Sequence, residues 1–352
     1  MSIVYILFGI LIFGVLIAVH EFGHFAVAKA CNVRVNEFSV GMGPALWKKQ
    51  KGETLYALRA VPIGGYGAMA GEDESSDDPR AFTNASVWKR ALILCAGSFM
   101  NFLLGFVIVL LLFSNAKAFY APILVSFMDG CPYEGEEALM VGDRFYRIDG
   151  HRVYEISDVG EYLDRGDGVH DIVVIRGGKK VELKSFAIER REYEGRENKM
   201  YGFNFGVEEA TPLVKLRRAW ETCLGFARMV WQGLEQLVRG QVGVKDMAGP
   251  VGVVNMMAET GEQAASTGDG LWNILYLGAF IAVNLAIVNM LPIPALDGGR
   301  VFLLFVTAII EGLTRKKLDP KYEGAIHAAG MVLLLGLMAF VMFNDILRIV
   351  KG

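Results

Sequence analysis

Two histidines four residues apart, His20 and His24, enclose a glutamate, Glu21, in the stretch VHEFGHF at residues 19–25. On a helix this spacing places both imidazoles on one face, one turn apart, where they can bind the same metal ion. Glu21 can then take a proton from a water molecule that the metal activates, as in the HExxH pattern of zinc peptidases. The alternative is a polar pair that bridges two helices, but that role does not require Glu21.

A catalytic zinc ion needs a third protein ligand and leaves its fourth position to water. The best candidate is Asp297, in NMLPIPALDGGR at residues 289–300, where two prolines break a helix and two glycines allow a tight turn. Broken backbone at membrane depth is tolerated where it lines a cavity or is buried in protein. Taken alone, Asp297 is better explained as an ordinary Asp-Gly turn residue, but the order and direction of the apolar stretches argue for a ligand. Among the other histidines, His327 at the start of the last apolar stretch is a lesser candidate, whereas His151 and His170 lie in the long insert between the second and third apolar stretches.

The elements that must position these residues are apolar. The chain has 352 residues, 53% of them hydrophobic, and a mean hydropathy of +0.37, which is too apolar for an ordinary soluble protein. A net charge of −3 gives no indication of a nucleic-acid partner. Four stretches have the roughly 20 apolar residues that a transmembrane helix needs. They are Ile3–Ala28, Ala91–Phe113, Leu271–Leu291 and Ile326–Val350. We therefore expect a multi-pass α-helical protein of the cell membrane, surrounded by lipid bilayer.

Lysines and arginines set the predicted orientation in the membrane. They are concentrated between the first and second apolar stretches and between the third and fourth, so the positive-inside rule makes both loops cytoplasmic. Both termini and the long insert at about 114–270 are then extracytoplasmic. His20 lies about 26 Å along a helix from Ile3, at about 1.5 Å per residue, and hence near the cytoplasmic side. The third stretch runs in the same direction, so Asp297 arrives at the same side and at a similar depth.

Residues 118–208 of the insert are typical of a small soluble domain, because short β-rich runs (FYRI, HDIVVI, VELKSFAI) alternate with turn signals. The stretch YEGEEALMVGDRFYRIDGHRV resembles the signature of PDZ domains, which bind peptides by strand addition. A generic small β domain is the alternative. Residues 212–239 have helical periodicity with charged positions, which favours an amphipathic helix at the membrane interface, anchored by Trp220 and Trp231. A helix packed on the insert is nearly as good an interpretation.

The resemblance to a known family rests on HEFGH in the first apolar stretch and on the N-x-x-P-x-P-x-L-D-G pattern that begins at Asn289. Both are similar to motifs of the site-2 protease family of intramembrane zinc metalloproteases, and the insert makes the likeness closest to the bacterial RseP type with a single PDZ domain. Residues 38–72 resemble that family's cytoplasmic β-segment, so the resemblance covers nearly the whole chain. At GSFMN (97–101) the family usually has Gly-Pro-x-x-Asn. Here Asn101 is kept but Ser98 replaces the proline, which leaves the helix break expected there open.

The resemblance implies an intramembrane endopeptidase with one Zn2+ per chain, bound by His20, His24 and Asp297, with Glu21 as the catalytic base. It implies substrates that are transmembrane segments of single-span membrane proteins already cut by another protease, such as anti-sigma factors or remnant signal peptides. Two rival functions remain. One is another class of HExxH membrane peptidase, whose third ligand is a glutamate, and the other is a PDZ membrane scaffold with an inactive site.

Two asparagines in the third apolar stretch, Asn284 and Asn289, are candidates for substrate binding. They are equally compatible with a hydrogen bond between helices and with a role in holding the substrate backbone or the oxyanion near the metal. Family analogy places Asn284 nearer to the substrate.

The segment ETLYALRAVPIGGYGAMAG (53–71) is a candidate for a second substrate contact. Its run Thr54–Val61 has strand-like content, and the glycines after it indicate a turn or a close backbone approach. We expect it to bind an unwound substrate as an added strand, through Gly64, Gly65 and Tyr66. A hairpin that only packs against the membrane helices is the alternative.

These expectations divide the chain into four parts. Residues 1–113 hold the first two transmembrane helices, the HExxH motif and a membrane-associated β-segment at about 33–72. Residues 114–210 form an inserted α+β PDZ-like domain, 211–270 form amphipathic interfacial helices, and 271–352 hold the last two transmembrane helices and the LDG motif.

Overall fold

The computed structural model describes residues 3–72, 76–241, 243, 249–263, 270–315 and 320–351. The chain forms two compact units. Unit 1 comprises Met1–Leu112 and Thr222–Gly352, and unit 2 comprises Phe113–Glu221. Unit 2 therefore contains the whole of the predicted insert at 114–210 and continues into the helix that follows it.

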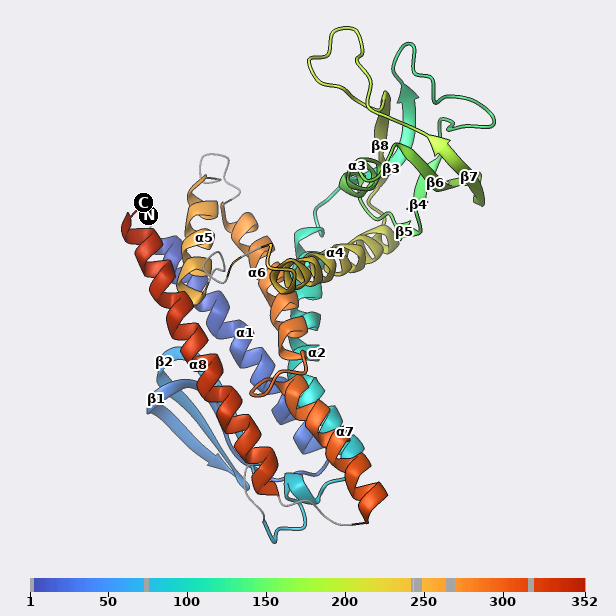
Figure 1. Ribbon diagram of the computed structural model, residues 1–352. Coiled ribbons are helices and arrows are strands. Elements are labelled where there is room, and N and C mark those ends of the chain that lie inside the picture. Colours follow the sequence, from blue (N-terminus) through green and yellow to red (C-terminus); the bar gives the residue numbers. More distant parts are fainter. Residues whose placement is uncertain are drawn as a thin grey trace. The chain divides into compact units, whose positions relative to one another are not determined.

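Four long apolar helices of unit 1, among the residues that the structure describes, have the length and composition of membrane spans. They are α1 (Ile3–Ala30), α2 (Val87–Leu112), α6 (Gly270–Asn289) and α8 (Pro320–Lys351), as drawn in Figure 1. The four predicted spans are confirmed, with ends that differ by a few residues. The start of α1 and the end of α8 lie at the same end of unit 1 (Figure 1).

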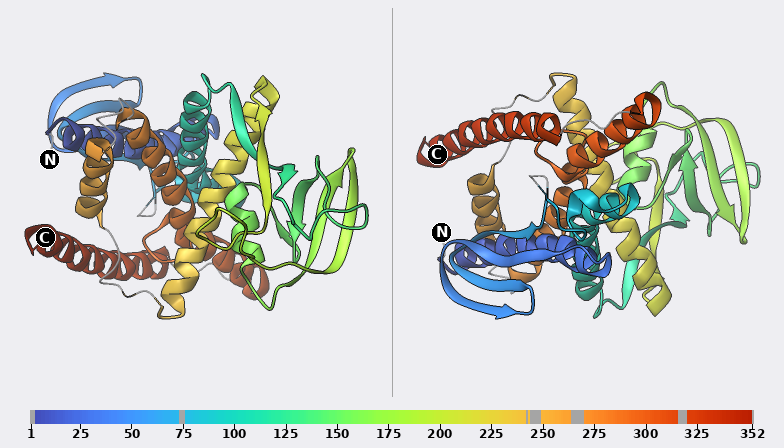
Figure 2. Two further views of the ribbon diagram at one scale, coloured as in Figure 1. Left: turned by 90° about the horizontal axis from the view of Figure 1, so that it is seen from above. Right: turned by 90° about the horizontal axis from the view of Figure 1, so that it is seen from below.

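Unit 1 has further elements beside these spans. They are the 3-10 turn η1 (Phe82–Asn84), α5 (Pro250–Gln263), α7 (Asp297–Thr314) and most of α4 (Pro212–Val238). Helix α5 contacts α1, α6 and α8, and Figure 2 shows it between α1 and α8. Helix α7 packs on α2 through apolar residues, with Leu304 buried in a cluster that includes Phe82 and Ile93.

Glycines allow α2 to lie close to its two neighbours. A Cβ atom on Gly23 of α1 would lie 2.5 Å from the carbonyl oxygen of Ala96 in α2, and one on Gly105 of α2 would lie 2.8 Å from Val283 of α6. Both distances are shorter than any real Cβ contact, so a side chain at either position would push the helices apart. Small residues are typical of such crossings, because helices in lipid associate by close packing and not by the hydrophobic effect.

Helix α2 runs without interruption from Val87 to Leu112 and passes through Ser98. A proline at this position would have removed a backbone N–H from the helix and displaced the carbonyl four residues earlier. This chain therefore lacks the helix break that the family's usual proline suggested at this point of α2. Ser98 and Asn101 are both buried, and their spacing of three residues places them on the same face.

The predicted β-segment is an antiparallel pair, β1 (Val35–Lys51) and β2 (Thr54–Met69). The first part of β1 pairs on both of its sides with β2, because both strands bend. Gly41 and Gly43 lie at the bend of β1, with φ of +86° and +82°, a conformation that favours glycine. From one edge of the sheet to the other, the order of the paired segments is 42–51, 54–61, 35–40 and 65–69.

Aromatic packing attaches this sheet to α1. The ring of Phe25 in α1 lies 4.8 Å from the ring of Phe38 in β1 and 5.9 Å from that of Tyr56 in β2, measured between centroids. The hydroxyl of Thr54, which is buried, donates a hydrogen bond to the carbonyl of Val35 at 2.7 Å. The sheet therefore has a fixed position beside the half of α1 that carries the HExxH motif.

A buried carboxylate links α8 to α5. Asp345 of α8 is 2% exposed, and its two oxygens accept hydrogen bonds from the backbone N–H groups of Gly249 at 3.3 Å and Gly252 at 2.9 Å. A helix leaves its first N–H groups unpaired, and its N-terminus carries a partial positive charge, so the carboxylate stabilises this end of α5. A Cβ atom on either glycine would lie 2.7 Å from an oxygen of Asp345, which explains the glycines.

Unit 2 is an antiparallel sheet with the helix α3 and the first part of α4. Its elements are β3 (Ala118–Phe127), β4 (Arg144–Ile148), β5 (His151–Arg152), α3 (Ile156–Leu163), β6 (Val169–Arg176), β7 (Lys179–Ala187) and β8 (Phe203–Glu209). The strand order is β7-β6-β4-β3-β8, and β5 pairs with β4. The runs FYRI, HDIVVI and VELKSFAI lie mainly in β4, β6 and β7, so the predicted strands are confirmed. The PDZ identity of this unit stays a prediction.

The boundary between the units falls inside α4, so its two parts are described separately. In unit 2, the buried guanidinium of Arg218 donates to the backbone carbonyl of Tyr120. In unit 1, Phe226 packs edge-on against aromatic rings of α6. Trp220 and Trp231 are 49% and 63% exposed, as membrane anchors would be. The helix thus has both a packed and an open face, and its interfacial role stays a prediction.

Candidate metal centre

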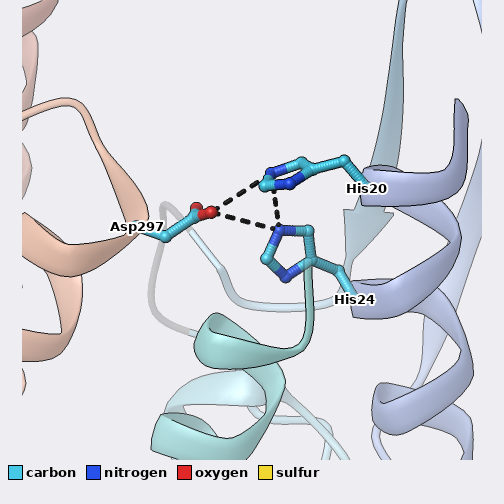
Figure 3. A group of neighbouring side chains, drawn as sticks. All are labelled: His20, His24 and Asp297. Atoms are coloured by element: carbon cyan, nitrogen blue, oxygen red, sulfur yellow. Dashed lines mark hydrogen bonds and ion pairs between the residues drawn. The ribbon is translucent and has the colours of Figure 1, made fainter. Parts of the chain in front are cut away.

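His20, His24 and Asp297 are the one group of three potential metal ligands found within the described part of the chain. Figure 3 shows the two imidazoles of α1 facing the carboxylate at the start of α7. The Nε2 atoms of the histidines lie 3.2 Å apart, and Oδ2 of Asp297 lies 3.1 Å from Nε2 of His20 and 3.4 Å from Nε2 of His24. Tetrahedral zinc with bonds of about 2.0–2.1 Å separates its ligand atoms by about 3.3 Å. The three separations therefore fit a shared zinc ion.

The carboxylate of Asp297 gives a second indication that these residues fit a metal. Its Oδ2 atom is buried and has no hydrogen-bond partner among the described residues, although both Nε2 atoms are close to it. A buried carboxylate oxygen without a hydrogen bond is costly. Coordination of a cation at the point that the three atoms share would remove this cost.

The chain presents Asp297 through a tightly folded loop between α6 and α7. Ala295 has φ of +78°, which is uncommon for a residue with a side chain. A Cβ atom on Gly298 would lie 2.2 Å from the backbone of Met290, and one on Gly299 would lie 2.1 Å from the carbonyl oxygen of Ile293. Both glycines are therefore required for the loop to fold back on itself and to place Asp297 at the first residue of α7.

Helix α2 fixes the orientation of both imidazoles. Nδ1 of His24 lies 2.7 Å from the carbonyl oxygen of Ile93, so its N–H donates there and Nε2 keeps a lone pair. Nδ1 of His20 lies 3.3 Å from the side-chain amide of Asn101, whose Oδ1 atom is buried without a partner. With this amide turned by 180°, Oδ1 accepts the Nδ1–H of His20, and Nε2 is again free for a metal.

Gly97 of α2 makes room for the imidazoles. A Cβ atom at this position would lie 2.3 Å from Nε2 of His24 and 2.7 Å from Cε1 of His20. In the sequence, Gly97 and Asn101 stand out only as part of the motif GSFMN. The sequence shows a glycine and an asparagine in an apolar helix. It does not show which face of α2 meets the histidines.

Glu21 lies beside the edge of the β-segment. A Cβ atom on Gly65 would lie 3.3 Å from Cγ of Glu21 and 2.9 Å from the carbonyl oxygen of Ser39, so Gly65 permits a close approach of the strand. Gly64 has φ of +92°, and a Cβ atom there would lie 2.8 Å from the side chain of Met42. The structure thus brings the outer segment 65–69 of the sheet next to the predicted base.

Tyr66 takes part in a polar network on the sheet. Arg59 donates to the hydroxyl of Tyr66, to the carboxylate of Glu37 and to the hydroxyl of Ser39, at 2.6–2.7 Å. Burial alone would raise the pKa of Glu37, but the hydrogen bonds from Arg59 and Tyr66 lower it below its ordinary value. Glu37 therefore remains a carboxylate at neutral pH, and the network holds the outer segment 65–69 in place.

The remaining candidates lie outside the metal group. Asn284 and Asn289 are half-buried on α6, and Asn289 is its last residue. His327 of α8 accepts a long hydrogen bond of 3.4 Å from the N–H of Ala295, so it contacts the loop that carries Asp297. The two other histidines belong to unit 2, where His170 pairs with Asp149 and His151 stacks on Tyr162.

Two histidines and an aspartate with the separations of zinc ligands, a glutamate beside them and apolar helices around them define a metalloprotease of the membrane. The chain belongs to Peptidase family M50, whose model matches residues 8–337. It is 35% identical over 349 residues to a protein of Clostridium perfringens assigned as a zinc metalloprotease, with 97% of this chain and 98% of that protein covered. It is 27% identical over 422 residues to zinc metalloprotease RasP of Bacillus licheniformis, with 97% and 98% covered.

The chain is therefore a zinc metalloprotease and a multi-pass membrane protein. The matches confirm the predicted family, the enzyme class and the zinc cofactor. They also set aside the interpretation as an inactive scaffold.

Proposed function

We propose that this protein is an intramembrane endopeptidase that cleaves transmembrane segments of single-span membrane proteins. His20, His24 and Asp297 are its zinc ligands, one ion per chain, and Glu21 is its catalytic base. The observation that carries the proposal is the set of separations of 3.1, 3.2 and 3.4 Å between three potential ligand atoms, on helices with the composition of membrane spans.

Zinc held by these residues would polarise the scissile carbonyl and make water a better nucleophile. The carboxylate of Glu21 accepts the proton of the attacking water and returns it to the leaving amine. Asn284 or Asn289 donates a hydrogen bond to the oxygen that becomes negative, which stabilises the transition state.

A transmembrane helix must unwind before its peptide bonds can be cut. In lipid, each freed N–H and C=O group costs several kcal/mol unless it is paired again. The outer segment 65–69 of the β-segment can pair these groups by strand addition. Its position beside Glu21 supports this role, because Gly65 lets the strand lie close to the side chain of the proposed base. Gly64, Gly65 and Tyr66 are the proposed contact residues.

The orientation and the role of unit 2 belong to the same proposal. Both termini and unit 2 are extracytoplasmic, and the metal centre lies near the cytoplasmic side. Unit 2, as a PDZ-like domain, limits access of bulky substrates and takes no part in the chemistry. The substrates are accordingly proteins already shortened by another protease, such as anti-sigma factors or remnant signal peptides.

The test is metal analysis of the purified protein together with cleavage of a model single-span substrate. Glu21→Gln should keep about one zinc and lose cleavage, whereas His24→Ala and Asp297→Ala should lose both. His327→Ala is the matched control, because this histidine contacts the same loop outside the ligand group, and it should keep both. Retention of zinc in Asp297→Ala would favour the other class of HExxH peptidase, and full activity of Glu21→Gln would overturn the role of this base.

The contact with the substrate is tested separately. Single cysteines at residues 61–69, in the Glu21→Gln background, should crosslink to a cysteine near the scissile bond of a bound substrate. If the substrate co-purifies but none of these positions crosslinks, strand addition at this edge is wrong.

A further inference from the structure

An ion pair joins the β-segment to the helix that begins with Asp297. The guanidinium of Arg300 in α7 donates to Oε1 of Glu72, which follows the end of β2. The two side chains are 31% and 17% exposed, so the pair is largely shielded. Hydrogen bonds between two charged groups are stronger and more directional than neutral ones.

Arg300 is rigidly connected to the metal centre. It lies one helical turn after Asp297, and its backbone N–H donates to the carbonyl of Leu296 at 3.1 Å. The loop that precedes it is held by the two glycines that pack against backbone. A displacement of the Arg300 side chain would therefore also shift Asp297.

Glu72 is rigidly connected to the proposed substrate-binding edge. The backbone N–H of Ala70 donates to the carbonyl of Arg34, just after α1, and the N–H of Phe82 donates to the carbonyl of Ala70. The same strand, a few residues earlier, passes Glu21 at Gly65. The ion pair thus connects the element that would hold the substrate with the element that carries the third ligand.

From this geometry we infer that Glu72 and Arg300 are positioning residues, which keep the outer segment 65–69 in register with Asp297. The inference rests on the proposed function. Helix α7 packs on α2 through apolar contacts, which oppose separation but tolerate sliding. A directional polar contact near its first turn restricts that sliding. Catalytic groups have to be held within about 0.5 Å of their productive positions, so such a restraint matters for cleavage.

The test is a charge exchange in the full-length protein. Glu72→Arg, Arg300→Glu and the double variant are compared with wild type for zinc affinity, by competition with a chelator, and for cleavage with zinc at saturation. Each single variant should bind zinc about 10- to 100-fold more weakly, as for other residues that orient metal ligands. Cleavage should fall at least tenfold even when every site holds zinc. The double variant should recover most of both quantities.

Arg80→Gln is the matched control. It removes the ion pair between Arg80 and Glu53, which lies in the same part of the chain, and it leaves Glu72 and Arg300 intact. It should behave as wild type. Arg300→Gln serves as a milder variant if a reversed charge prevents folding, which thermal unfolding would reveal.

Two results would overturn the inference. One is cleavage within twofold of wild type at saturating zinc in the single variants. The other is a folded double variant that is no better than the single ones. Zinc affinity is measured independently of cleavage, so it tests the pair even if wild type cuts no membrane substrate, a result that would instead overturn the proposed function.

Discussion

A single methyl group on α2 should displace the proposed zinc ligands. In Gly97→Ala, the new Cβ atom would lie 2.3 Å from Nε2 of His24, whereas ordinary contacts begin at 3.4 Å. The imidazole would have to move by about 1.1 Å, but metal–ligand distances tolerate only about 0.2 Å. We expect zinc to bind at least about 100-fold more weakly, which corresponds to about 2.8 kcal/mol.

The same substitution distinguishes displacement of the imidazoles from a loss of helix stability. Alanine in place of glycine stabilises a helix interior by about 0.5–1 kcal/mol, so helix propensity alone predicts a more stable protein. Zinc affinity is measured by competition with a chelator and the fold by thermal unfolding of the metal-free protein. Gly336→Ala in α8 is the control, because a Cβ atom there meets nothing within 4 Å. Wild-type zinc affinity in a folded Gly97→Ala variant would refute the argument.

Three further predictions follow from other contacts. Asn101→Ala should weaken zinc binding about 10- to 100-fold, because Nδ1 of His20 loses its partner, and Asn101→Asp should retain most of the affinity because it keeps an acceptor. Asp345→Ala should lower the free energy of unfolding by about 1–3 kcal/mol, since N–H groups of α5 lose their acceptor; thermal unfolding measures this, and an unchanged transition would contradict it. Deletion of residues 118–208 should leave zinc binding and cleavage of short substrates intact and relax the rejection of bulky ones. Loss of zinc in a well-folded deletion variant would show that the insert does more than limit access.

The grouping of His20, His24 and Asp297 could be predicted because it follows from helical spacing and from the number of apolar spans. The spacing of His20 and His24 is that of one helical turn, and counting the spans places Asp297 at the same side of the membrane. Neither step requires knowledge of side-chain packing. The separation of the ligand atoms to within a few tenths of an ångström, in contrast, depends on the loop before α7. That loop has a left-handed conformation at Ala295, a residue that gives no hint of it.

The parts that could not be predicted depend on how elements rotate against each other. Gly97 and Asn101 face the histidines only because of the way α2 is turned about its axis. The long strand β1 also had no clear signal, since Gly41, Gly43 and Pro44 interrupt its pattern and argue for a turn. The structure uses these residues to bend the strand, so that its first part can pair on both sides.

The two outermost segments of this sheet differ in their charged residues. The outer segment 42–51 is exposed along its length and carries Lys48, Lys49 and Lys51, whereas the segment 65–69 has no charged residue. Lysines on an edge strand discourage another chain from pairing there. Association of two copies of this protein through their sheets is therefore disfavoured at one edge by like charge. The other edge lies beside α1 and carries no such charge, so it stays available for pairing with the backbone of an unwound substrate.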